Sequence, residues 1–164
     1  MVINIGIIYC IPIICGSIAV YTDRKEKKIR NKVTYPLILS GIIFQTVLNG
    51  QSGFKSSMMG ILICFILLSV LPGTKFSGGD IKLSMGYGAY LGTNSAYYVL
   101  ITLSLIIIFN ILGIVRNYGT ADLYKRLELE IISFGKVTAQ ADKIVAAPIL
   151  LISYTLALII MLWG

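Results

Sequence analysis

Long apolar segments recur from one end of the chain to the other and constrain its fold more than any other feature. Six can be placed, at Val2–Tyr21, Val33–Leu48, Ser56–Leu71, Gly79–Leu91, Ser95–Val115 and Ile144–Trp163. A helix crosses the ~30 Å hydrocarbon layer with about 20 apolar residues. Hydrophobic residues make up 57% of the 164 positions, above the ~45–50% of soluble domains. The sequence therefore predicts an all-α membrane protein with six transmembrane helices, forming one domain over residues 1–164.

The basic residues lie in the loops between these segments and predict an orientation. If all six segments cross, 13 of the 14 Lys and Arg residues share one side, and Lys55 lies on the other. The positive-inside rule places the basic side in the cytoplasm and both termini outside. The formal charge of +7 is thus explained by topology and by attraction to anionic lipid headgroups, without nucleic acid.

Two segments need separate treatment. The fourth is short and rich in glycine, so we expect surrounding protein to shelter it. Gly88 and Gly92 have the small-xxx-small spacing of close helix contacts, and Gly86 adds to that small surface. The loop after Val115 has apolar residues spaced along one helical face, which predicts an amphipathic cytoplasmic segment between helices 5 and 6. The alternative for this segment is a cover for the bundle without chemistry. Its apolar residues are Leu123, Leu127, Ile131 and Phe134.

The composition excludes several kinds of catalytic site. The chain has no histidine, which removes Ser-His and Cys-His catalysis and most zinc and haem ligand sets. Its three cysteines, Cys10, Cys15 and Cys64, lie inside apolar runs and form no CxxC pair, so we interpret them as core residues. No metal or cofactor is expected.

Two of the seven acidic residues stand apart from the others, which lie among basic neighbours in loops. Asp23 ends the first apolar segment and Asp80 opens the fourth, which places both at the cytoplasmic interface of the six-span arrangement. Ionisable groups at membrane depth often mark function. Two adjacent carboxylates can share one proton, so that the ionised group activates water while the protonated group donates to a scissile carbonyl. The pair predicts aspartic peptide hydrolysis.

Each aspartate also has a purely structural explanation. Asp23 could be a solvated helix end. Ser77-Gly78-Gly79-Asp80 fits a capping box, in which Ser77 caps the helix and Asp80 reaches back to it. The two glycines argue against capping alone, because they lower helix propensity where a cap should start a helix.

The motifs around these aspartates resemble those of the prepilin peptidases of type IV pili and related secretion systems, including archaeal preflagellin peptidases. They are more distantly similar to presenilin-type proteases through GxGD. Asn31 follows Asp23 at the family spacing. In the second motif, Gly78, Gly79, Asp80 and Lys82 stand in Ser-Gly-Gly-Asp-Ile-Lys-Leu. The resemblance implies that Asp23 and Asp80 are the catalytic pair, with Asn31, Lys82 and the two glycines in support.

The resemblance also implies a substrate, a location and a form of the enzyme. The substrate is a prepilin-like protein with a short leader and an apolar helix, cleaved at the cytoplasmic face of a prokaryotic membrane. The absence of CxxC motifs and of a large insertion indicates the short, peptidase-only form found with Flp/Tad-type pili, so N-methyltransferase activity is not expected. Two departures from the family pattern are Ser77, in place of the first glycine of GxGD, and Arg30, in place of a proline.

Two other functions are compatible with the residues. A Ser-Lys dyad could use Ser77 or Ser84 with Lys82 or Lys75. A non-enzymatic transporter or assembly subunit could use polar residues inside the spans, Gln45 and Asn110, although interhelical hydrogen bonding explains them more simply.

Overall fold

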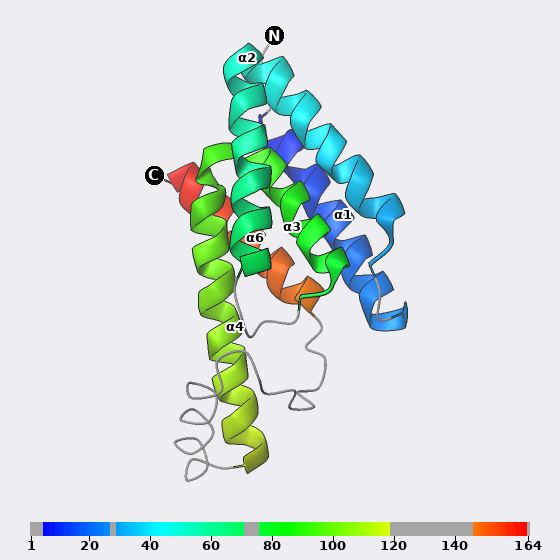
Figure 1. The fold of residues 1–164 in the computed structure, drawn as a ribbon, viewed down its shortest axis with the longest axis vertical. Coiled ribbons are helices and arrows are strands. Elements are labelled where there is room, and N and C mark those ends of the chain that lie inside the picture. Colours follow the sequence, from blue (N-terminus) through cyan, green and yellow to red (C-terminus); the bar gives the residue numbers. More distant parts are fainter. Residues whose placement is uncertain (1–4, 27–28, 71–75, 119–145, 164) are drawn as a thin grey trace.

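The protein is a bundle of helices (Figure 1). The computed structural model describes residues 5–26, 29–70, 76–118 and 146–163, and within these ranges it contains helices and no strand. The all-α prediction is confirmed for them. The elements are α1 (Ile5–Glu26), α2 (Asn31–Val70), α3 (Gly78–Leu91), the short 3₁₀ helix η1 (Gly92–Asn94), α4 (Ser95–Tyr118) and α6 (Ala146–Trp163). The predicted amphipathic segment from Leu123 to Phe134 lies outside the described residues.

Two described stretches are long and apolar enough to cross a membrane. They are Asn31–Ser69 and Gly78–Phe109, and Ala146–Met161 forms a shorter apolar helix. The outward faces of these helices carry large apolar side chains, for example Ile43, Leu100 and Ile159, which are 59%, 61% and 54% exposed. Apolar surface of this extent is unusual on a soluble monomer, which agrees with a chain that lies in a membrane.

α2 holds both the second and the third predicted segments and reverses direction between them. Gly50 lies inside it with φ 60° and ψ −138°, in the left-handed region that glycine adopts without a steric penalty. No atom lies within 4 Å of the place where a Cβ would stand, so backbone conformation accounts for the glycine there. Figure 1 shows the two arms of α2 leading to and away from this turn.

α3 packs against both arms of α2 through its glycines. A Cβ on Gly88 would lie 2.5 Å from the carbonyl oxygen of Gly60 and 2.8 Å from Sγ of Cys64 in the second arm. Gly92 contacts Ser56 in the same arm, while a Cβ on Gly86 would lie 2.6 Å from Leu37 in the first arm. The prediction that α3 is sheltered through its small surface is confirmed.

Tyrosines fill the space where α3, α4 and α6 meet. The ring of Tyr87 stacks on Tyr154 at a centroid distance of 4.6 Å and meets the edge of Tyr98 at 5.8 Å. All three side chains are fully buried. In the neighbouring layer, the Gln45 side-chain amide donates a hydrogen bond to the carbonyl of Tyr90. This confirms the interhelical role expected of Gln45, whereas the Asn110 side chain lies outside what the structure describes.

Candidate active site

Asp80 begins the buried face of α3 and takes part in its cap. The Asp80 amide donates to Ser77 Oγ at 3.4 Å, and Asp80 Oδ2 accepts from the Ser77 amide at 2.8 Å. The capping box expected for this stretch is therefore present. Asp80 is 6% exposed, and the same helical face continues through the buried Leu83 and Tyr87. The cap holds the carboxyl group in a fixed position at the start of the helix.

Ser77 fits this turn without strain. Its φ of −69° and ψ of 154° are extended backbone, which any residue adopts. The replacement of a glycine by serine at the start of the second motif therefore leaves the backbone unstrained, and it supplies the hydroxyl that caps α3.

Asp23 lies in the last turn of α1, which continues to Glu26, beyond the predicted apolar segment that ends at Tyr21. The buried face of α1 passes through Pro12, Gly16 and Ala19, and Asp23 is the next position at the same 4-3-4 spacing. Its side chain is partly exposed, and it has no hydrogen-bond partner within the described part of the chain. The carboxyl group thus stands where the buried stripe of α1 reaches the end of the bundle.

Two contacts show that α1 and α3 run in opposite directions. The Tyr87 side chain lies on Gly16, where a Cβ would be 3.3 Å from Cζ of the ring. Further along, Gly79 lies against Ile29, with 3.0 Å between the Ile29 Cβ and the place of a Gly79 Cβ. Ile29 follows the end of α1, so a position later in this part of the chain pairs with an earlier residue of α3. In Figure 1 the C-terminal end of α1 and the N-terminal end of α3 lie at the same end of the bundle.

The two glycines of the second motif have different surroundings. Gly79 meets Ile29, which is 3% exposed and lies between α1 and α2. Gly78 has no atom within 4 Å of its Cβ position. An added Cβ at position 79 would therefore press on Ile29, which would have to shift by a few tenths of an ångström, whereas position 78 is open. The sequence did not distinguish the two positions.

Lys82 and Asn31 are brought together across the two motifs. Lys82 Nζ donates a hydrogen bond to Asn31 Oδ1 at 3.1 Å, and it also lies 5.2 Å from the centroid of the Tyr35 ring. This distance is within the range of a cation–π interaction. Tyr35 was not singled out from the sequence, and no pattern within its own helix points to Lys82.

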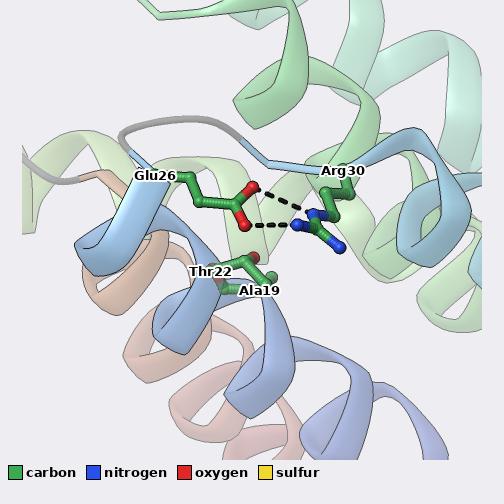
Figure 2. Close-up of polar contacts among 4 residues, drawn as sticks. All are labelled: Ala19, Thr22, Glu26 and Arg30. Carbon is green, nitrogen blue, oxygen red and sulfur yellow. Dashed lines mark hydrogen bonds and ion pairs between the residues drawn. The ribbon is translucent and has the colours of Figure 1, made fainter.

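Glu26 and Arg30 form an ion pair between the end of α1 and the start of α2 (Figure 2). Arg30 Nε donates to Glu26 Oε2 at 2.9 Å, and Nη2 donates to Oε1. The hydrogen bond from Arg30 lowers the pKa of Glu26, and the same contact raises the pKa of Arg30. Glu26 is thus a solvated acid that offsets a nearby base, as expected. The sequence analysis did not name its partner, Arg30, which lies four residues further along the chain.

The described residues of the alternative Ser-Lys dyad form hydrogen bonds with other residues and not with each other. Ser84 Oγ donates to the hydroxyl of Tyr98 at 3.1 Å in the buried core, Ser77 caps α3, and Lys82 bonds Asn31. Lys75 lies outside the described residues. Within the described residues, neither serine forms a hydrogen bond with Lys82.

Comparison with protein families identifies a match. The model of the type IV leader peptidase family matches residues 10–114, a range that contains Asp23, Asn31, Asp80 and Lys82. Searches of curated proteins and of solved structures find no significant match.

Proposed function

Because the chain belongs to the type IV leader peptidase family, we propose that it is a membrane aspartic endopeptidase of the GxGD type. Its substrates are prepilin-like proteins, and it removes their short leaders. Asp23 and Asp80 are the catalytic residues, and water is the nucleophile.

The observation that carries this proposal is the register of α1 and α3. Asp23 is seven residues after Gly16, and Asp80 is seven residues before Tyr87, the residue in contact with Gly16. Seven residues are nearly two turns, or ~10.5 Å of helix. Because the helices are antiparallel, the step from Gly16 forward to Asp23 in α1 and the step from Tyr87 back to Asp80 in α3 lead toward the same end of the bundle. In each helix, seven residues also bring the side chain back to nearly the same face. This register supports the proposal that the two carboxyl groups lie at similar levels of the bundle, on faces that approach each other.

Two carboxyl groups in this arrangement can share one proton. The ionised group takes a proton from water as the water attacks the peptide carbonyl carbon, and the protonated group donates to the carbonyl oxygen. Collapse of the tetrahedral intermediate then breaks the C–N bond, and a proton passes to the leaving amine. The cap of α3 holds Asp80 for this role, because its backbone contacts keep the carboxyl group at the helix start.

We further propose that six helical segments cross the membrane: α1, the two arms of α2, α3, α4 and α6. The basic loops place Asp23 and Asp80 at the cytoplasmic face, with both termini outside. α3 has 14 residues, or ~21 Å of helix, and its glycine contacts with α2 compensate for its short length. The loops attract anionic lipid. The substrate's apolar helix lies in the membrane, and its leader remains at this face.

The test is co-expression with a candidate prepilin and detection of the cleaved product. Asp23→Asn and Asp80→Asn should each abolish cleavage, because asparagine keeps the shape but cannot exchange the proton. Asp142→Asn, the same change at an acid outside the motifs, serves as the control and should leave cleavage intact. Ser77→Ala and Ser84→Ala test the dyad.

Complete processing by either aspartate variant would exclude the aspartic mechanism. Loss of cleavage in Ser77→Ala or Ser84→Ala at unchanged protein level, with both aspartate variants active, would establish the dyad instead. A chain that processes no prepilin, even with both aspartates present, would support a transporter or assembly subunit.

A further inference from the structure

We propose that Glu26 and Arg30 are positioning residues, which hold the connection between α1 and α2 so that Asp23 and Asp80 stay in register. We call this ion pair the α1–α2 clasp. The proposal rests on the proposed function, since it concerns the same aspartates. The clasp is a property of this chain, because Arg30 stands where the family pattern has proline.

The geometry of the clasp is specific. Both oxygens of Glu26 are used, one by Nε and one by Nη2 of Arg30 (Figure 2). Paired hydrogen bonds of this kind restrict the relative orientation of the two groups, which a single contact does not. Glu26 is the last residue of α1, and Arg30 directly precedes α2. The clasp thus joins the end of one helix to the start of the next.

The helix dipoles do not explain these charges. A carboxylate is unfavourable at the C-terminal end of a helix, and a cation is unfavourable at the N-terminal end. Glu26 and Arg30 occupy those two unfavourable places. Their contact with each other is therefore what stabilises this arrangement, and an exchange of the two residues would satisfy both dipoles as well as the pair.

The residues next to Arg30 connect the clasp to the candidate active site. Ile29 packs on Gly79, which directly precedes Asp80. On the other side, Asn31 accepts the hydrogen bond from Lys82. Arg30 itself accepts a backbone hydrogen bond from the Val33 amide at 3.0 Å, so its position is tied to the first turn of α2.

The other end of the clasp, Glu26, lies close in sequence to Asp23. Glu26 lies three residues after Asp23, which is about one helical turn. The ion pair therefore links the turn that carries Asp23 to the segment that packs against the start of α3. Without it, Ile29 and Asn31 can move relative to α1, and the separation of the two carboxyl groups is less defined. Misplacement of catalytic groups lowers the rate of the chemical step more than the binding of substrate.

The experiment measures kcat and KM for leader cleavage with the full chain in membranes. Arg30→Gln and Glu26→Gln should each lower kcat by about two- to fivefold, the scale of an exposed ion pair, with KM unchanged. Arg30→Glu alone should be worse, because two carboxylates then face each other. The exchanged double variant, Glu26→Arg with Arg30→Glu, should recover the wild-type kcat. Arg24→Gln removes a charge of the same sign from the last turn of α1 and should have no effect.

A second measurement does not depend on cleavage. Hydrogen exchange at the Val33 amide should be faster in both single variants and return to the wild-type rate in the exchanged variant. The proposal would be overturned if the double variant Glu26→Arg with Arg30→Glu had a kcat no higher than that of Arg30→Glu alone. It would also be overturned if the single variants left hydrogen exchange at the Val33 amide unchanged. A change confined to KM would do the same, since it would indicate leader binding by Arg30. Cleavage of the leader by the Asp23→Asn variant would refute the proposed function. The rates of hydrogen exchange at the Val33 amide would still test the clasp.

Discussion

Lys82 Nζ donates a hydrogen bond to Asn31 Oδ1 across 3.1 Å, although 51 positions separate the two residues in the chain. One follows Asp80 by two residues and the other follows Asp23 by eight. The bond thus joins the two motifs, and the Tyr35 ring beside the ammonium group supports it. A contact in this place can determine how the start of α3 is held relative to the start of α2.

We predict that Lys82→Met and Asn31→Ala each lower leader cleavage by about three- to tenfold, which corresponds to about 0.7–1.4 kcal/mol, the net contribution of one ordinary hydrogen bond. The double variant should lose no more than the worse single variant, because both changes remove the same contact. Rates of cleavage in membranes would measure this coupling. Lys55→Met removes an exposed lysine remote from the motifs and is the control. Losses that multiply in the double variant would contradict a shared role.

Alanine at the two motif glycines should have opposite outcomes. At position 79 the new Cβ would stand 3.0 Å from the Ile29 Cβ, so Gly79→Ala should displace Ile29 and reduce cleavage. At position 78 the Cβ has open space, and Gly78→Ala should retain activity while favouring the helix by about 0.5–1 kcal/mol. Cleavage and thermal stability of both variants would test this difference. Equal losses would show that the contact with Ile29 is not what requires glycine.

The contact of α3 with the second arm of α2 should tolerate no side chain. Gly88→Ala would place a Cβ 2.5 Å from the Gly60 carbonyl oxygen, and overpacking of this kind costs about 1–3 kcal/mol. We expect a lower unfolding temperature in detergent and a lower protein level in membranes. Gly50→Ala is a comparison for backbone strain, because that site has space but a φ of 60°. A fully stable Gly88→Ala variant would indicate looser helix packing.

The three core tyrosines should differ when their hydroxyl groups are removed. The hydroxyls of Tyr87 and Tyr154 are buried and have no hydrogen-bond partner in the described part of the chain, so Phe at either site should be neutral or stabilising. Tyr98 accepts from Ser84, and Tyr98→Phe should destabilise the protein by about 1 kcal/mol. Unfolding temperatures of the three variants would rank them. Destabilisation by Tyr87→Phe would reveal a partner for its hydroxyl, such as a bound water.

The α1–α2 clasp should weaken in acid. Arg30 lowers the pKa of Glu26 below its ordinary value of 4.5 in the folded protein. A lowered folded-state pKa contributes stability that is present above the ordinary value and is lost as pH falls through the lowered one. Hydrogen exchange at Val33 should therefore accelerate, relative to its intrinsic rate, below about pH 4.5. Glu26→Gln should abolish this change, and its persistence in that variant would assign the titration to another group.

The helical segments and the candidate site residues could be predicted from local stretches of the sequence. The predicted segment Val33–Leu48 lies within α2, the predicted segment Ser56–Leu71 coincides with α2 as far as Val70, and Gly79–Leu91 matches α3 to within one residue. Apolar runs and capping residues act over a few positions, so they can be read locally. The capping box at Ser77 is an example, since both of its partners lie within one turn.

The contacts between those residues became visible only in the folded bundle. The structure showed that α1 continues beyond Asp23, that Gly79 rather than Gly78 lies at a close contact, and that Lys82 bonds Asn31. These relations depend on the register and separation of helices that are distant in sequence. Register results from the packing of many side chains at once, such as Tyr87 on Gly16, and no single stretch of the chain contains that information.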